Sequence, residues 1–257
     1  MNWGALDWGI LGPAFVAGIL VLATHFPLVT QVLDRGIVFI DLAISQIAGL
    51  GVIAANSAGM PQGGVAVQAA AVSAALLGAL LLTWTERRNP KQQEALIGVM
   101  FVLAACTSIL ILASNPHGGE HLRDLLVGQI LWVNTTQLLW LAGVSFVLLL
   151  ALWSGWVQKL GRFGFYAVFA LAVTASVQVV GVYLVFASLI IPALGTGAIR
   201  GPRRNALAFG IGSAAYAIGL ALSALLDLPS GALVVLALAA CATVSVLTLR
   251  SVRSGPP

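Results

Sequence analysis

Long apolar runs, broken by short polar segments, dominate the pattern of residues along this chain. Seven of them cover residues 10–30, 37–56, 65–84, 95–114, 137–153, 206–225 and 231–249. Each is close to the roughly 20 apolar residues that a helix needs to cross the hydrocarbon core of a bilayer. The run over residues 165–199 is too long for one crossing at about 1.5 Å per residue, so we divide it at Gly181 into two short helices. The pattern therefore predicts an all-α polytopic membrane protein, a bundle of about nine transmembrane helices.

The basic residues predict which ends of these helices face the cytoplasm. With the N-terminus outside, nine crossings place eleven of the twelve lysines and arginines on the cytoplasmic side and leave only Arg123 outside. If residues 165–199 crossed only once, six basic residues would lie on each side. Because basic residues accumulate in cytoplasmic loops, we expect nine crossings, with the N-terminus outside and the C-terminus inside.

The composition excludes an ordinary soluble domain. Hydrophobic residues make up 60% of the chain and charged residues 8%, against about a quarter charged in soluble proteins. The crossings use most of the 257 residues, so we expect residues 1–257 to form a single transmembrane domain in the lipid bilayer. The net charge of +4 comes from small basic groups at the ends of apolar runs, which indicates membrane topology and not a nucleic-acid partner.

The segment from Pro27 to Gly51 carries the most informative polar residue. Pro27 is expected to break the end of the first helix, ahead of a short basic turn. Asp41 then lies inside the second run, on the same helical face as Ser45 and roughly that of Asn56. A carboxylate inside a membrane is costly and usually faces a pore or a partner, so Asp41 and Ser45 are candidates for a translocation pathway. The alternative is that Asp41 only caps the second helix near its cytoplasmic end.

The long run at residues 165–199 contains further pathway candidates. Gln178 and Thr174 lie one helical turn apart. Pro192 removes one backbone hydrogen bond and frees the carbonyl of Ser188, and a freed carbonyl at membrane depth is tolerated where it lines a cavity or finds a helix partner. We therefore add Gln178, Ser188 and Pro192 to the candidate pathway.

Residues 117–121 read HGGEH and match the His-x-x-Glu-His pattern of one class of zinc proteases. That chemistry needs both histidines on one rigid helical face and a third ligand downstream, whereas the proline and glycines around the motif favour a loop. Three interpretations stay open. The segment is an intramembrane metalloprotease site, a loop in which His117, Glu120 and His121 bind incoming metal transiently, or a plain polar loop.

Several segments resemble the permease subunits of ATP-binding-cassette (ABC) transporters for divalent metals, of the zinc and manganese uptake type. Pro27, Arg35 and Gly51 fall in register with that family's first cytoplasmic turn and second helix. Three segments are similar as well: TERRNPKQQEALIGVM at 85–100, LLVGQILWV at 125–133 and, most closely, GVYLVFASLIIPA at 181–193. The resemblance covers nearly the whole chain.

The second helix departs from the pattern of that family. Many members carry an Asp and, four residues on, a His that are implicated in metal passage. In this register Leu42 takes the place of the Asp and Gln46 the place of the His, with the carboxylate one residue earlier at Asp41. Gln46 joins the candidate pathway through this register. An amide is a poor zinc ligand, so the family's choice of metal does not transfer directly.

The segment between the fifth and sixth predicted helices departs as well. Residues 154–164 read SGWVQKLGRFG, which is shorter and more basic than the family's acidic coupling segment. Its position nevertheless implies contact with the ATPase subunit. The candidate docking residues are Trp156, Lys159 and Arg162.

The resemblance implies a permease that moves divalent metal ions, zinc or manganese, into the cytoplasm by alternating access. It implies no permanently bound cofactor, since the metal ion is the substrate. The implied partners are an ATP-hydrolysing subunit, an extracytoplasmic metal-binding protein and a second copy of the permease, in a bacterial inner membrane. The chain has no Gly-x4-Gly-Lys-Ser/Thr phosphate loop, so we expect a transport subunit and not an enzyme. A secondary transporter that uses Asp41 as a proton or ion relay is the alternative.

Overall fold

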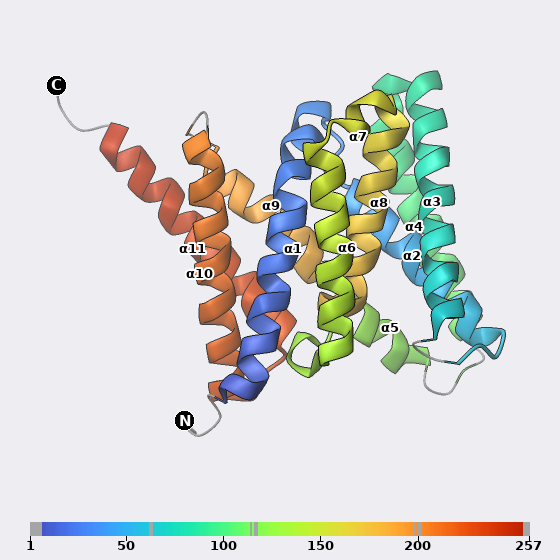
Figure 1. The fold of residues 1–257 in the computed structure, drawn as a ribbon, viewed down its shortest axis with the longest axis horizontal. Coiled ribbons are helices and arrows are strands. Elements are labelled where there is room, and N and C mark those ends of the chain that lie inside the picture. The colour runs from blue at the N-terminus through green and yellow to red at the C-terminus, as the bar shows by residue number, and fades with distance from the viewer. Residues whose placement is uncertain are drawn as a thin grey trace.

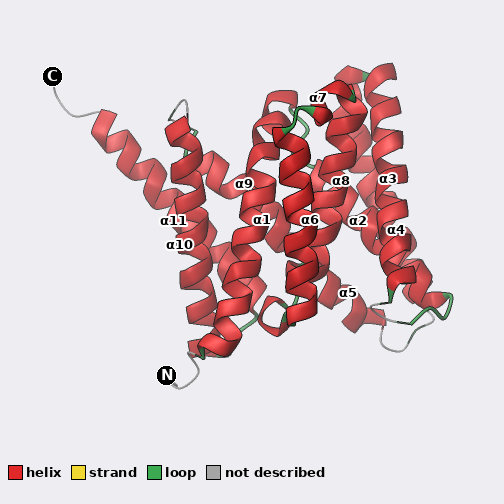
Figure 2. Cartoon of the chain, in the orientation of Figure 1, coloured by secondary structure: helices red, strands yellow, loops and turns green. Residues whose placement is uncertain are grey.

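Helices account for the regular structure of the described residues, and no strand occurs among them (Figure 2). The computed structural model describes residues 7–61, 64–113, 115, 118–197, 199 and 202–253. The α-helices are α1 Trp8–Arg35, α2 Ile40–Ser57, α3 Val65–Arg88, α4 Gln93–Leu112, α5 Gly118–Val127, α6 Thr135–Trp153, α7 Trp156–Lys159, α8 Gly161–Val180, α9 Val182–Gly195, α10 Pro202–Leu226 and α11 Ser230–Arg253. Two 3₁₀ turns precede α4 and α6: η2 Pro90–Gln92 and η3 Ile130–Trp132.

The membrane-spanning helices follow the apolar runs. Within the described residues, eight helices are long and apolar enough to cross a membrane, and α9 is a shorter apolar helix of 14 residues. Gly181 separates α8 from α9 with a φ of 84° and a ψ of 161°, a conformation that is essentially restricted to glycine. The predicted division of the long run at Gly181 is therefore confirmed, and so is the all-α polytopic fold.

The prediction that Pro27 ends the first helix is wrong, because α1 continues through Pro27 to Arg35. Proline removes one backbone hydrogen bond, but neighbouring helices hold such a segment in place inside a membrane protein. Gly36 ends α1 instead, in a left-handed conformation with its N–H donated to the carbonyl of Leu33. The longer α1, of 28 residues, carries Arg35 to the end of the bundle.

Burial divides the helices into an inner and an outer set. In α8, 78% of the span is buried inside the protein and in α2 61%, whereas the shares for α4 and α6 are 22% and 17%. The outer helices expose large apolar side chains such as Leu103, Leu139 and Phe146, as expected where hydrocarbon surrounds the protein. Most of the candidate polar residues therefore lie on helices that protein encloses.

The start of α1 and the end of α11 lie at opposite ends of the bundle (Figure 1). The ends of α1 and α3, the short α7 and the start of α10 lie at one end, which we call the basic end, and α5 lies at the other. Arg35, Arg88 and Lys159 are in the last turns of α1, α3 and α7, whereas Arg123 is in α5. This arrangement fits an odd number of crossings. The assignment of the basic end to the cytoplasm stays a prediction.

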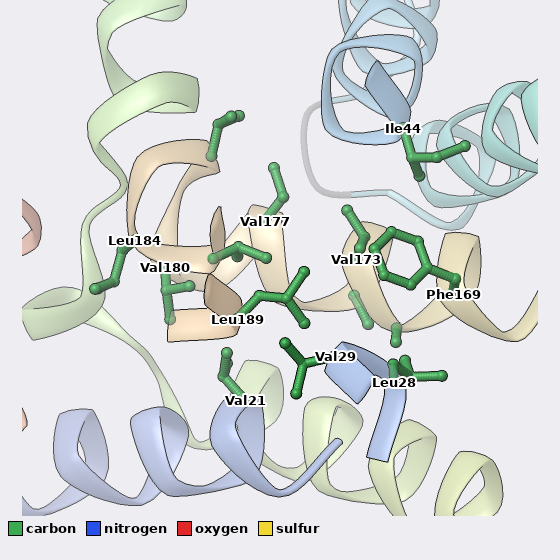
Figure 3. Packing of buried hydrophobic residues seen from close by; sticks show 14 of the residues in the cluster. Val21, Leu28, Val29, Ile44, Phe169, Val173, Val177, Val180, Leu184 and Leu189 are labelled. Atoms are coloured by element: carbon green, nitrogen blue, oxygen red, sulfur yellow. The ribbon is translucent and has the colours of Figure 1, made fainter. Parts of the chain in front are cut away.

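Small residues allow the inner helices to approach closely. Gly51 of α2 packs against α3 so tightly that a Cβ on it would lie 2.8 Å from the carbonyl oxygen of Ala70, and close backbone approach of this kind is how helices associate in lipid. Larger side chains fill the space around α8. Figure 3 shows those from α1, α2, α8 and α9: Val21, Leu28, Val29, Ile44, Phe169, Val173, Val177, Val180, Leu184 and Leu189.

Candidate functional site

Helix α2 carries a carboxylate and a hydroxyl deep inside the protein. Asp41 and Ser45 are fully buried. Neither carboxylate oxygen of Asp41 has a hydrogen-bond partner among the described residues, and neither does the hydroxyl of Ser45. Buried polar groups are normally paired, and leaving a carboxylate unpaired is costly. These two side chains are therefore expected to meet a ligand or water.

Asp41 does not cap α2. The helix begins at Ile40, its N-cap residue is Phe39, and no side chain accepts a hydrogen bond from the first turn at that cap. The backbone N–H of Phe39 donates to Oε1 of Glu94 in α4 at 3.2 Å, and the ring of Phe39 stacks on Phe186 of α9 with centroids 6.5 Å apart. The capping interpretation is wrong, because contacts from two other helices hold the start of α2.

A cavity of about 710 Å³ lies beside α2. Its walls come from α2, α3, α5, α6 and α8 and from the turn between α5 and α6. On α2 the wall includes Ala48 and Val52, which are seven and eleven residues beyond Asp41 and therefore lie on the same helical face. Ser45 is on that face as well, between Asp41 and Ala48. One face of α2 thus leads from the cavity to the buried carboxylate.

Amide and hydroxyl groups supply most of the polar wall of this cavity. Gln68 of α3 and Thr174 and Gln178 of α8 line it. One buried atom of each side chain lacks a hydrogen-bond partner among the described residues: Gln68 Oε1, Thr174 Oγ1 and Gln178 Nε2. Asp124 of α5 is the one carboxylate that the described wall contains, and its side chain is exposed. The cavity therefore offers unused hydrogen-bonding groups and little charge.

The other predicted pathway residues lie elsewhere in the core. Gln46 is buried on α2, and Ser188 and Pro192 are buried in α9. The hydroxyl of Ser188 donates to the carbonyl of Leu184 at 2.6 Å and pairs with the hydroxyl of Tyr216 in α10 at 2.8 Å. None of the three lines the 710 Å³ cavity. Of the candidates on α8 and α9, the structure brings Gln178 and Thr174 to its wall.

The segment predicted as a loop around the HGGEH motif is helical from Gly118 onward. Glu120 and His121 fall in the first turn of α5, and His117 lies outside the described residues. The loop prediction fails because α5 is amphipathic and packs its leucines inward; Leu125 contacts α2 beside Gly49. The described residues contain no group of three or more His, Cys, Asp and Glu that could hold a metal ion.

The predicted docking segment, residues 154–164, forms α7 and the start of α8 at the basic end. Trp156 is 67% exposed, and Lys159 is exposed as well. Arg162 turns back toward the bundle, with Nε 3.8 Å from Oε2 of Glu86 at the end of α3. Oε1 of Glu86 is 3.5 Å from Arg35 at the end of α1. These two ion pairs connect the segment to α1 and α3.

Glu86 and Gln68 were not among the predicted site residues, although each has a signal in the sequence. Glu86 is a single acid within the basic stretch at residues 85–91, and Gln68 is a single amide within the apolar run at residues 65–84. Polar residues inside a membrane span tend to face the interior of the protein. Which residues they face depends on helix packing, which the residue pattern does not contain.

Comparison with known proteins identifies a family. Residues 7–160 and 153–249 match the ABC 3 transport family. An uncharacterized membrane protein of Synechocystis is 29% identical over 181 aligned positions, and the match covers 63% of this chain. The match spans 64% of the length of that relative.

Two solved structures share the fold. PsaBC from Streptococcus pneumoniae, solved in complex with a Fab, superposes with a TM-score of 0.75 at 21% identity, over 94% of this chain and 92% of that chain. A metal-chelate type ABC transporter in an inward-facing conformation superposes with a TM-score of 0.64 at 17% identity, over 92% of this chain and 85% of that chain. At these identities the likeness establishes the arrangement of helices and not the substrate.

Proposed function

The chain belongs to the ABC 3 transport family, and we propose that it is the membrane-spanning permease of an ABC importer for divalent metal ions, zinc or manganese. In this proposal the chain forms the path through the membrane, and a separate subunit hydrolyses ATP. The family match over most of the chain and the likeness in fold to PsaBC support a permease of the metal type.

The unpaired carboxylate of Asp41 is the observation that favours a cation as the substrate. Its burial without a hydrogen bond is unfavourable unless a cation or a proton compensates the charge. Carboxylate oxygens bind both zinc and manganese, and the hydroxyl of Ser45 lies one turn away on the same face. A passing ion would meet an attractive group that lacks the full set of ligands of a tight site, so release would stay fast.

Access to Asp41 would alternate between the two ends of the bundle. The cavity lies on the α5 side, and its wall on α2 begins at Ala48, seven residues beyond Asp41. On the other side, the start of α2 is closed by the stack of Phe39 on Phe186 and by the hydrogen bond to Glu94. We infer that ATP binding, transmitted through α7, draws the helix ends at the basic end together, and that these contacts separate and open Asp41 toward the basic end after ATP is hydrolysed and released.

Each expected partner has a place in this proposal. The exposed Trp156, Lys159 and Arg162 would dock the ATPase subunit at the basic end. An extracytoplasmic metal-binding protein would deliver the ion at the opposite end, near α5, where His117, Glu120 and His121 would pass it on as a transient relay. A second copy of the permease would complete the complex in a bacterial inner membrane.

Reconstitution tests this proposal. The permease, purified with its ATPase subunit and its binding protein, would be placed in proteoliposomes with ATP enclosed, and radioactive zinc or manganese would be added outside. Metal accumulation that requires hydrolysable ATP is the expected result. Accumulation driven by a proton gradient without ATP would contradict it and favour a secondary transporter with Asp41 as the relay.

A further inference from the structure

The 710 Å³ cavity is far larger than a bare metal ion needs. A divalent ion in a protein is held by donors at about 2.0–2.6 Å, which must close around it. Pockets of about 300–1,000 Å³ are instead the size of sites for organic ligands. This cavity therefore has room for an occupant bulkier than the ion alone.

The polar groups in the wall also favour an organic ligand. Beside Gln68, Thr174 and Gln178, the described polar wall contains two further amides and one further hydroxyl, those of Gln129, Gln137 and Thr136, and it contains no histidine or cysteine. Amides and hydroxyls are weak ligands for zinc, but they donate and accept hydrogen bonds with organic groups. The wall thus suits the outer surface of a metal complex and not the metal.

The unpaired atoms define what such a complex must offer. Gln68 Oε1 is an acceptor, Gln178 Nε2 is a donor, and the hydroxyl of Thr174 is both. All three are buried within α3 and α8 behind the cavity surface, without hydrogen-bond partners among the described residues, so a ligand meets them when these side chains turn toward the cavity. A ligand with both N–H donors and carboxylate acceptors would satisfy this set, as an amino-acid-like chelator does.

Charge and apolar surface restrict the ligand further. The described wall has no lysine or arginine, and its one carboxylate is Asp124, so an anionic complex would find no counter-charge. Trp132 and Trp140 supply indole surface for the organic part.

We propose that this cavity binds the metal as a neutral organic chelate of the amino-acid type, and not as a bare ion. The inference rests on the proposed function, because it names the form in which that importer takes its metal. The cavity is the first binding position inside the membrane, and Asp41 lies beyond it along α2.

Zinc bis-histidinate, which is neutral, is the probe for this site. Uptake into the proteoliposomes described above is measured at a fixed concentration of free zinc while zinc bis-histidinate is increased. In parallel, binding of the same complex to the purified permease assembly without ATP is followed by the fluorescence of Trp132 and Trp140. We expect saturable binding of the chelate and uptake that rises with it.

Variants separate recognition of the chelate from transport of the ion. Gln68→Leu should raise the KM for zinc bis-histidinate about tenfold, the effect of losing one buried hydrogen bond, and change the KM for free zinc less than twofold. Gln92→Leu makes the same chemical change at an exposed position of η2 and should alter neither. The milder Gln68→Asn serves if the leucine variant does not fold.

The outcomes distinguish this inference from the proposed function. Uptake of free zinc without binding of the chelate, or equal effects of Gln68→Leu on both forms, would overturn the inference without contradicting the proposed importer. Binding of the chelate without uptake of either form would leave the binding site standing and contradict the importer. If the chelate does not bind and neither form is taken up, both the inference and the proposed function are contradicted.

Discussion

Ser45 and Ser188 are both buried hydroxyl groups in inner helices, but only Ser188 is paired. Its hydroxyl lies 2.8 Å from that of Tyr216, whereas Ser45 has no partner among the described residues. A hydroxyl that pairs between two helices indicates a structural role. A buried hydroxyl without a partner indicates a group that binds a ligand. The proposed path therefore runs past Ser45, and Ser188 holds α9 to α10.

Ser188→Ala should lower the stability of the permease and leave its transport intact. Removing the hydroxyl leaves Tyr216 unpaired, and we expect a loss of about 1 kcal/mol, since hydrogen bonds between membrane helices contribute roughly 0.6–1.7 kcal/mol. Adding Tyr216→Phe should recover part of that loss. Unfolding in detergent measures the stability, and metal uptake measures the function. Unchanged stability together with lost uptake would return Ser188 to the pathway.

The site was only partly predictable from the sequence, and the reason lies in single residues. Asp41 was found because a carboxylate in an apolar run is costly wherever it lies. The role of Gln68 could not be found in this way, because it depends on α3 meeting α8 more than 100 positions later in the chain. Gln46, placed in the pathway by register alone, is buried outside the cavity.

At the scale of elements, the helices themselves were predictable where a run is long and apolar. A backbone inside lipid must satisfy its own hydrogen bonds, so such a run forms an α-helix. The prediction failed at Pro27 and at α5 for the same physical reason. In both places tertiary contacts outweigh the local preference of proline or glycine to interrupt a helix.

Gly181, at the break between α8 and α9, tolerates no side chain. Its φ of 84° with a ψ of 161° costs roughly 1–3 kcal/mol in any other residue, and a Cβ there would overlap the backbone of Gly128. We expect Gly181→Ala to abolish the folded permease in detergent, as judged by size-exclusion chromatography. Gly143→Ala in α6, where a Cβ meets no described atom within 4 Å, should fold normally. A folded, active Gly181→Ala variant would contradict this account of the break.

The short α7 is the element that we assign to the ATPase. Exposed aromatic side chains often form the centre of an interface, so Trp156→Ala should weaken assembly with the ATPase subunit and reduce transport-coupled ATP hydrolysis by roughly tenfold or more. Trp8→Ala, at the exposed start of α1 at the opposite end of the bundle, is the matched control and should assemble normally. Assembly and hydrolysis that are unchanged in Trp156→Ala would remove this residue from the interface.

At the scale of the whole molecule, the two ends of the bundle have different chemistry. The basic end carries α7 and the ion pairs of Glu86 with Arg35 and Arg162, and the cavity opens among residues of α5 and α6 toward the other end. This polarity agrees with a protein that receives its substrate at one end and energy at the other.

Cysteine labelling in intact cells tests the orientation. In a background without Cys106 and Cys241, we expect a membrane-impermeant maleimide to label Arg123→Cys in α5 and not Gln158→Cys in α7. Positive charge favours the cytoplasmic side of a membrane, and both wild-type side chains are exposed. Permeabilised cells provide the control, because both positions should then react. Labelling of position 158 alone in intact cells would invert the topology.

The most direct test of the account is metal uptake by Asp41→Asn. The substitution keeps the size and hydrogen-bonding capacity of the side chain and removes the charge that we assign to attracting the cation. We predict an intact complex whose ATP-dependent uptake of zinc and manganese falls at least a hundredfold. Asp227→Asn is the matched control, since Asp227 is exposed with a φ of 54°, which asparagine also adopts, and it should transport normally. Wild-type uptake by Asp41→Asn would contradict the central role of this carboxylate.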